Sequence, residues 1–199
     1  MNKSMKMQSE SGIVGDVKEQ VELAQEEYFQ DNSKSRLFKK NQKFDCAESV
    51  VDSVSLEKLL GATIFRIGSR IIVDYTLLKT FAYPKLYNSI AQYGLTMVQQ
   101  AIIEYGTYEV HLNLKSFSIS AVERYKPLVE SFFQEMPPED TQYYTNLKNV
   151  FIYHPPSFFS TLHNIVKRFV TSDPESVIIR LINKDVSDVE YQNLTMMMN

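Results

Sequence analysis

The chain has 199 residues, 44% of them hydrophobic and 23% charged, with a formal net charge of −3. This length fits one domain with a sizeable core, and the slight negative charge argues against a nucleic-acid binder, which usually carries a basic excess. The single cysteine, Cys46, excludes an intramolecular disulfide and a multi-cysteine metal site, and we expect it to be a small packed hydrophobe.

The N-terminal part is predicted to be helical after a short polar lead. Residues 1–12 are polar, lack the apolar core of a signal peptide and are predicted to be disordered. Apolar residues at helical spacing predict a helix over Gly12–Gln30. Further on, Asp45 can cap a short helix, with Glu48 three residues later as in a capping box. The sequence therefore predicts a small helical subdomain over residues 13–56.

The rest of the chain alternates between strand-like and helix-like patterns. Short β-branched and apolar runs predict strands at Arg70–Tyr75, Glu109–Leu114, Val150–Tyr153 and Val177–Ile182. Helical spacing of apolar residues predicts helices over 84–106, 121–134 and, after the last strand, within 184–199. Gly106 is well placed to end the first of these helices as a C′ glycine.

This alternation predicts the fold class. Strands separated by helical stretches form β-α-β units, which favour a mostly parallel sheet with right-handed crossovers. We therefore expect an α/β domain whose mixed sheet has four or five strands, mainly parallel and covered by helices.

Catalytic groups are sparse in the sequence. The three histidines, His111, His154 and His163, share no metal-ligand spacing, and there is no nucleophile elbow, P-loop or glycine-rich phosphate cradle. His111 is predicted to be a hydrogen-bonded packing residue in a strand, and His154 a turn residue. We therefore expect no enzyme, no cofactor and no metal site.

One stretch, NVFIYHPPSFFSTLHNIVKRFV at 149–170, has an unusual layout. Pro155 and Pro156 must end the apolar strand before them, and Ser157 can cap a following helix. That helix has a single apolar stripe, formed by Phe158, Leu162, Ile165, Val166 and Phe169. Such a stripe is typical of a helix that covers a sheet, and two cations near its end suit the helix dipole.

Four blocks of the sequence resemble, in order, the CRAL-TRIO domain family, the fold of the yeast phosphatidylinositol transfer proteins and the tocopherol transfer protein. The blocks are RLFKKNQKFDCAESV, GSRIIVDY, EVHLNLKSFSIS and YYTNLKNVFIYHPPSFFSTLHNIVKRFV. They lie between Arg36 and Ile182. The resemblance implies a CRAL-TRIO-like lipid-binding domain over residues 57–199, following the helical subdomain.

The resemblance also implies a ligand site and a membrane contact. In this family, the helix after an Asn-Ala-Pro turn is a gate over an apolar pocket, which places the gate at 157–170. The implied pocket and gate residues are Phe151, Tyr153, Phe158, Phe159, Leu162, Ile165 and Val166. The implied membrane contact is formed by Lys167, Arg168, Phe169 and Val170, since cations beside an apolar tip suit an anionic bilayer.

The sequence departs from the family pattern at several positions. His154-Pro155-Pro156 replaces Asn-Ala-Pro. Members that bind phosphatidylinositol use a Glu and a Lys where this chain has Thr145 and Ile179. Loss of both charges argues against an inositol-phosphate headgroup.

Two functional hypotheses follow. The first is binding, and transfer, of a lipid or other small hydrophobic ligand by a protein that contacts membranes peripherally. The alternative is a protein-interaction module on a CRAL-TRIO-like shell with a filled pocket. No stretch approaches the roughly 20 apolar residues of a membrane span, so we expect a soluble, cytoplasmic protein, peripherally membrane-associated, with no nucleic-acid partner.

Overall fold

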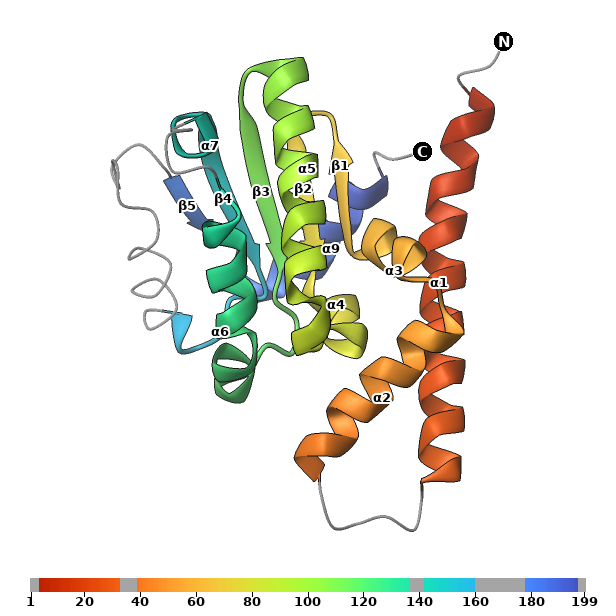
Figure 1. The fold of residues 1–199 in the computed structure, drawn as a ribbon. Coiled ribbons are helices and arrows are strands. Elements are labelled where there is room, and N and C mark those ends of the chain that lie inside the picture. The colour runs from red at the N-terminus through yellow and green to blue at the C-terminus, as the bar shows by residue number, and fades with distance from the viewer. Residues whose placement is uncertain (1–3, 33–38, 137–141, 160–177, 197–199) are drawn as a thin grey trace.

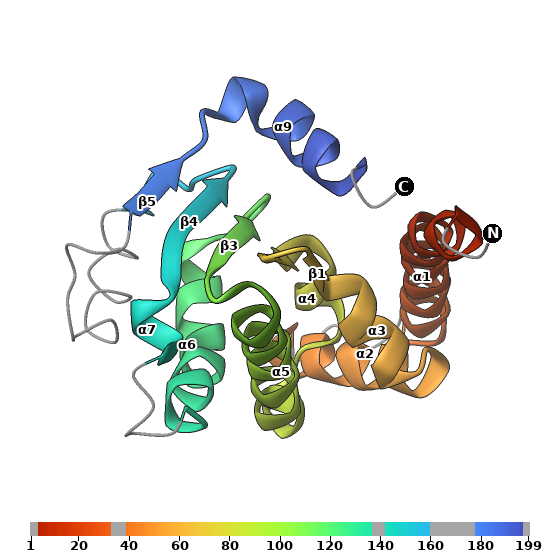
Figure 2. The ribbon, with the colours of Figure 1, turned by 90° about the horizontal axis from the view of Figure 1, so that it is seen from above.

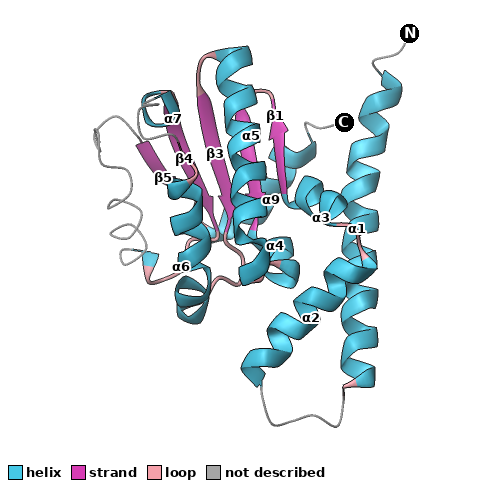
Figure 3. Ribbon diagram, in the orientation of Figure 1, coloured by secondary structure: helices cyan, strands magenta, loops and turns pink. Residues whose placement is uncertain are grey.

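The computed structural model describes residues 4–32, 39–136, 142–159 and 178–196 (Figures 1 and 3). The strands are β1 (Ile64–Ile67), β2 (Arg70–Asp74), β3 (Tyr108–Asn113), β4 (Leu147–Tyr153) and β5 (Ile178–Leu181). The helices are α1 (Ser4–Asp31), α2 (Lys39–Ser53), α3 (Leu56–Thr63), α4 (Tyr75–Phe81), the 3-10 turn η1 (Pro84–Leu86), α5 (Tyr87–Tyr105), α6 (Ile119–Gln134), α7 (Gln142–Thr145) and α9 (Lys184–Met196).

The strands form one mixed sheet in the order β1-β2-β3-β4-β5. β1 and β2 make an antiparallel hairpin, with Gly68 at a φ of 62° in its turn, and β2 to β5 are parallel neighbours. The prediction of an α/β chain with a mixed, mainly parallel sheet is therefore confirmed. β1 was not predicted, because its four residues show no clear alternation.

The two faces of the sheet have different neighbours. Alternate side chains of each strand point to opposite faces, and the first face, with Ile71, Val73 and Val110, packs in the main core. Figure 2 shows α5 and α6 on one side of the sheet and α9 on the other. Crossovers of one hand between successive parallel strands place their helices on the same face. The second face, with Ile72 and Tyr153, packs against Leu194 of α9 instead.

The N-terminal helices share their core with the sheet. Val17 of α1, Val50 of α2, Phe81 of α4 and Ile71 of β2 belong to one buried cluster. In Figure 1, α1 and α2 cross beside the β1 end of the sheet. The helices predicted over 13–56 are thus packed on the sheet domain through shared apolar side chains.

Helix α1 is longer than predicted. It begins at Ser4, so residues 4–12, for which we predicted disorder, are helical. A polar segment with scattered methionines can still be helical. Met, Lys, Gln and Glu are good helix formers. Residues 4–12 extend a helix whose later part has the apolar stripe, so they need no apolar stripe of their own.

Asp45 does not cap a helix, so the predicted capping box with Glu48 is wrong. α2 runs without interruption from Lys39 to Ser53, and Asp45 lies exposed in its interior. Cys46, Ala47 and Val50 are buried along the inner side of the same helix. Cys46 is thus packed as predicted, and burial raises the pKa of its thiol.

Helix α5 ends as its sequence predicted. Gly106 adopts a left-handed φ of 71°, and its N–H donates to the carbonyl oxygen of Ile102 at 2.8 Å. This is the C′ position at which glycine lacks the steric cost of a Cβ.

We expect Gly106→Ala to lower the free energy of unfolding by about 1–2 kcal/mol, because an L side chain is strained at this φ. Gly61→Ala is the matched control, since Gly61 lies within α3 and its added Cβ would meet only the Tyr93 hydroxyl oxygen at 3.7 Å. It should be neutral or stabilising by up to about 1 kcal/mol. Urea unfolding of both variants measures the difference, and equal effects would contradict this account of the cap.

Candidate functional site

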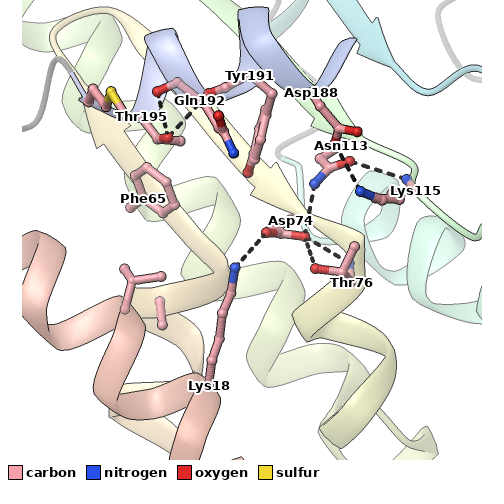
Figure 4. A pocket seen from close by; sticks show the side chains of 13 residues that line it. Lys18, Phe65, Asp74, Thr76, Asn113, Lys115, Asp188, Tyr191, Gln192 and Thr195 are labelled. Atoms are coloured by element: carbon pink, nitrogen blue, oxygen red, sulfur yellow. Dashed lines mark hydrogen bonds and ion pairs between the residues drawn. The ribbon is translucent and has the colours of Figure 1, made fainter. Parts of the chain in front are cut away.

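A cavity of about 400 Å³ lies where the carboxyl ends of β2 and β3 meet α1 and α9 (Figure 4). Ligands of open α/β sheets bind preferentially beyond the carboxyl ends of the strands. The cavity is lined by Val14, Lys18, Ala62, Phe65, Asp74, Thr76, Asn113, Lys115, Asp188, Tyr191, Gln192, Thr195 and Met196. Four separate segments of the chain therefore build one hollow.

Asp74 is the fixed charge of this cavity. It is the last residue of β2 and only 4% exposed. Its Oδ1 accepts hydrogen bonds from the Thr76 backbone N–H at 2.8 Å, the Thr76 hydroxyl at 2.6 Å and the Asn113 amide at 3.3 Å. The first of these bonds caps α4, which suits an Asp at an N-cap. The carboxylate is therefore held in place by strand, helix and neighbouring strand together.

Two lysines face the carboxylates of the cavity. The Lys18 Nζ lies 3.7 Å from the Asp74 Oδ2, and its side chain is 47% exposed. The Lys115 Nζ donates to the Asp188 Oδ1 at 2.9 Å. Figure 4 shows Lys18 reaching up from α1 toward Asp74, while Lys115 and Asp188 lie on the far side of Asn113. One end of the cavity is thus lined by charges of both signs.

The remaining lining is mixed, with polar side chains from Thr76, Gln192 and Thr195 beside apolar ones. Val14, Ala62, Phe65 and Met196 come from α1, α3, β1 and α9. Tyr191 extends from α9 toward Asp74 (Figure 4), and burial first, then the Asp74 charge, raises the pKa of its hydroxyl, which stays neutral. A cavity with both apolar and polar walls and with charged groups at one end fits a molecule that has a polar end and an apolar part.

Helix α9 is fastened over the second face by its first turns. Ser187 is fully buried; its hydroxyl accepts from the His154 backbone N–H at 3.1 Å and donates to the Asn183 carbonyl at 2.9 Å. His154, at a φ of 53°, also places its Nε2 3.2 Å from the Asp188 Oδ1. The hydrogen bond from Lys115, and then the nearby charges, lower the pKa of Asp188. The strand-ending turn thereby positions the helix that walls the cavity.

The second face holds a buried histidine beside the cavity. His111 is 4% exposed, stacks on the Phe151 ring at 4.5 Å and shares a hydrogen bond of 3.0 Å between its Nδ1 and the Tyr153 hydroxyl. Its Nε2 lies 3.8 Å from the Glu109 Oε2, too far for a hydrogen bond, and has no other hydrogen-bond partner among the described residues. Burial lowers the pKa of His111 to about 4, although Glu109 opposes the shift. His111 is therefore a neutral packing residue, bonded through one nitrogen.

Polar side chains continue along this face toward the amino ends of the strands. Glu109 accepts from the Asn149 amide, and its Oε2 lies 3.9 Å from the Arg70 Nε. The Arg180 Nε donates to the Asn149 Oδ1 at 3.3 Å, and its guanidinium lies over the Phe151 ring at 5.8 Å. These residues are cross-strand neighbours in the parallel register. They form a charged surface on the part of the sheet away from the cavity.

The sequence-predicted site residues fall in three places. Phe151 and Tyr153 lie on the second face beside His111. Phe158 lies near Phe117 in the loop after β3, with ring centroids 6.4 Å apart, and the Phe159 N–H donates to the Pro156 carbonyl. None of these four predicted residues lines the described cavity. The other predicted gate and membrane residues, Leu162, Ile165, Val166, Lys167, Arg168, Phe169 and Val170, lie outside the described residues.

Sequence reasoning missed the polar residues of the cavity. Asp74 and Asn113 each lie one residue before the end of a predicted strand, so the rule that ligands bind beyond the carboxyl ends of parallel strands could have found both. Lys18 and Tyr191 lie on distant helices, and no local pattern distinguishes them from ordinary surface residues.

Comparisons of the chain with family models, with curated proteins and with solved structures found no match. Within the described residues, no helix is long and apolar enough to cross a membrane. In the same part of the chain, no three His, Cys, Asp or Glu side chains form a group that could hold a metal ion.

Proposed function

We propose that the protein binds a small amphiphilic or apolar molecule, a lipid or a lipid-like compound, in the cavity between α1, α9 and the strand ends. The observation that carries the proposal is the form of this cavity, about 400 Å³, with apolar side chains from α1, α3, β1 and α9 and charged groups gathered at one end. The ordered resemblance to CRAL-TRIO domains supports the same ligand class. As a separate part of the proposal, which rests on the resemblance alone because Phe158 and Phe159 do not line this cavity, segment 157–170 acts as a gate and its end contacts the membrane.

The size of the cavity limits the ligand. Small-molecule sites commonly measure roughly 300–1,000 Å³, so about 400 Å³ lies near the lower end. A single-chain lipid or a compact apolar molecule fits this volume better than a phospholipid with two acyl chains.

Phosphatidylinositol is not the preferred ligand in this proposal. The family's headgroup lysine corresponds to Ile179, and Arg180 points to the opposite face of the sheet, over Phe151. A buried inositol phosphate needs charged and hydrogen-bonding partners. Arg180 therefore does not replace the missing cation.

Native mass spectrometry after incubation with mixed-lipid vesicles tests the proposal. We expect retention of a single-chain or weakly polar lipid and no enrichment of phosphatidylinositol over its share in the vesicles. Selective loading with phosphatidylinositol would contradict the assignment of the headgroup positions. Recovery of the protein without any lipid, from vesicles and from cells alike, would contradict the proposed function.

Membrane contact by the gate end has its own test. If Phe169 inserts into bilayers, Phe169→Asp should weaken flotation with anionic vesicles roughly tenfold or more and leave the melting temperature unchanged. Asn164→Asp, which adds the same charge off the predicted apolar stripe, is the matched control. A strong loss of stability in Phe169→Asp would instead identify Phe169 as core, because a buried carboxylate without a partner is costly.

A protein-interaction role remains the second candidate, and one observation favours it. Among the described strands, β5 lies at the edge of the sheet with Ile178 52% and Leu181 50% exposed, and Val186 and Val189 of the adjoining α9 are exposed as well. Exposed apolar edges are common docking sites for other chains. A protein that copurifies with another chain and never with a lipid would support this role over ligand binding.

A further inference from the structure

We infer that the cavity selects ligands whose polar end donates hydrogen bonds, a protonated amine above all and a hydroxyl next, and that this end is bound by Asp74. The inference rests on the proposed function and names the class of its ligand. It follows from a difference in mobility between two charged residues of the cavity. The Asp74 carboxylate is fixed, whereas the Lys18 ammonium opposite can move.

The Asp74 carboxylate cannot leave the cavity. Its Oδ1 is held by the Thr76 backbone, the Thr76 hydroxyl and the Asn113 amide, and the residue is 4% exposed. Its Oδ2 faces the Lys18 ammonium at 3.7 Å, longer than a hydrogen bond between charged groups, which measures about 2.7–2.9 Å. The neutral Tyr191 hydroxyl also lies beside this carboxylate and offers it a hydrogen bond without a charge. A buried carboxylate with so loose a counter-ion can form closer bonds with a donor that enters the cavity.

Lys18 can give up its place at little cost. It projects from α1 with 47% of its side chain exposed, and a long lysine side chain readily keeps its stem on the protein while its ammonium turns to water. A ligand ammonium then takes over the charge of Lys18 at Asp74. A ligand hydroxyl can bind in the same place, between Asp74 and the neutral Tyr191 hydroxyl (Figure 4).

An anionic ligand end meets the opposite situation. It would lie beside the fixed Asp74 charge, and Asp188 adds a second carboxylate to the lining. Lys115, the other cation there, already donates to Asp188 at 2.9 Å. Like charges in a partly desolvated site repel strongly, so carboxylate and phosphate ends are disfavoured.

Four probes with the same eight-carbon chain test this inference on the whole protein: octylamine, 1-octanol, octanoate and octyl phosphate. Isothermal calorimetry below their aggregation concentrations gives each dissociation constant. We expect octylamine, protonated at neutral pH, to bind at least roughly tenfold more tightly than octanoate and octyl phosphate. 1-Octanol should lie between these limits.

Two variants assign the preference to these residues. Asp74→Asn keeps an oxygen that can cap α4 and should weaken octylamine binding roughly tenfold while changing 1-octanol binding less than about threefold. Lys18→Gln removes the competing ammonium on an exposed stem and should tighten octylamine binding. Thermal melts confirm that both variants are folded, and Lys18→Gln gives a second, independent result if Asp74→Asn is not.

The outcomes separate the inference from the proposed function. Tight octyl phosphate binding, or octylamine binding that neither variant changes, would refute the inference and leave a lipid-binding cavity in place. Failure of all four probes to bind would refute both.

Discussion

Tryptophan at both Val14 and Thr195 is expected to reduce binding of octylamine and 1-octanol at least roughly hundredfold. Both positions line the cavity, one from α1 and one from α9. Two indole rings projecting from different walls would take up a large part of about 400 Å³ and clash with any ligand there. Among the described residues, the hydroxyl lost from Thr195 bonds to carbonyls of its own helix, at Tyr191 and Gln192, so its removal leaves no other described group without a partner.

The matched control places the same two side chains on the same helices but outside the cavity. Glu19 of α1 and Asn193 of α9 are exposed and do not line it. Glu19→Trp with Asn193→Trp should leave probe affinity within about threefold of the unmodified protein. Isothermal calorimetry gives the dissociation constants of octylamine and 1-octanol for both double variants. Unchanged affinity in the variant with tryptophan at Val14 and Thr195 would mean that ligands bind elsewhere.

Acidification is expected to weaken the fold through His111. Burial lowers the pKa of this imidazole from 6.5 to about 4. The unfolded chain therefore takes up a proton as the pH falls below about 6.5, whereas the folded protein resists protonation until about pH 4. His111 contributes its full stability at pH values above the pKa that it has in the unfolded chain, about 6.5. This contribution is lost as the pH falls toward the pKa that it has in the folded protein, about 4.

The expected loss is about 1–2 kcal/mol in the free energy of unfolding between about pH 7 and pH 5. His111→Phe keeps a ring against Phe151 and removes the titrating group, so its unfolding free energy should fall much less over this interval. His154→Asn is the control, because it removes a different histidine. Its unfolding free energy should still fall by about 1–2 kcal/mol over this interval. Urea titrations across the pH range test this, and the same slope in His111→Phe would show that another group causes it.

The sequence predicted the long and regular elements well. The apolar stripe of α5, its terminal Gly106 and the alternation in EVHLNL each encode their structure locally. α4 is too short to show a helical period and begins at Tyr75, which looked like the end of the strand before it. The sequence pattern at Asp45 is ambiguous, because the residues that favour a helix cap also occur on the solvent side of a continuous helix.

The site was far less predictable than the fold. Asp74 and Asn113 meet because β2 and β3 are parallel and in register. The pattern of residues within one strand does not show which residue of another strand it pairs with. Lys18 and Tyr191 come from the two ends of the chain and reach the same cavity through the packing of α1 and α9. Resemblance to a family pointed instead to the turn after β4, where His154 proves to anchor α9.

The binding of an amphiphile in the cavity is tested most directly by mass spectrometry of an organic extract from the purified protein. The unmodified protein is predicted to release a single-chain or other weakly polar lipid with a donor group, in amounts close to that of the protein. The variant with tryptophan at Val14 and Thr195, prepared in parallel, is predicted to release almost none. A ligand-free extract from the unmodified protein, or equal amounts of the same lipid from both proteins, would contradict binding in this cavity.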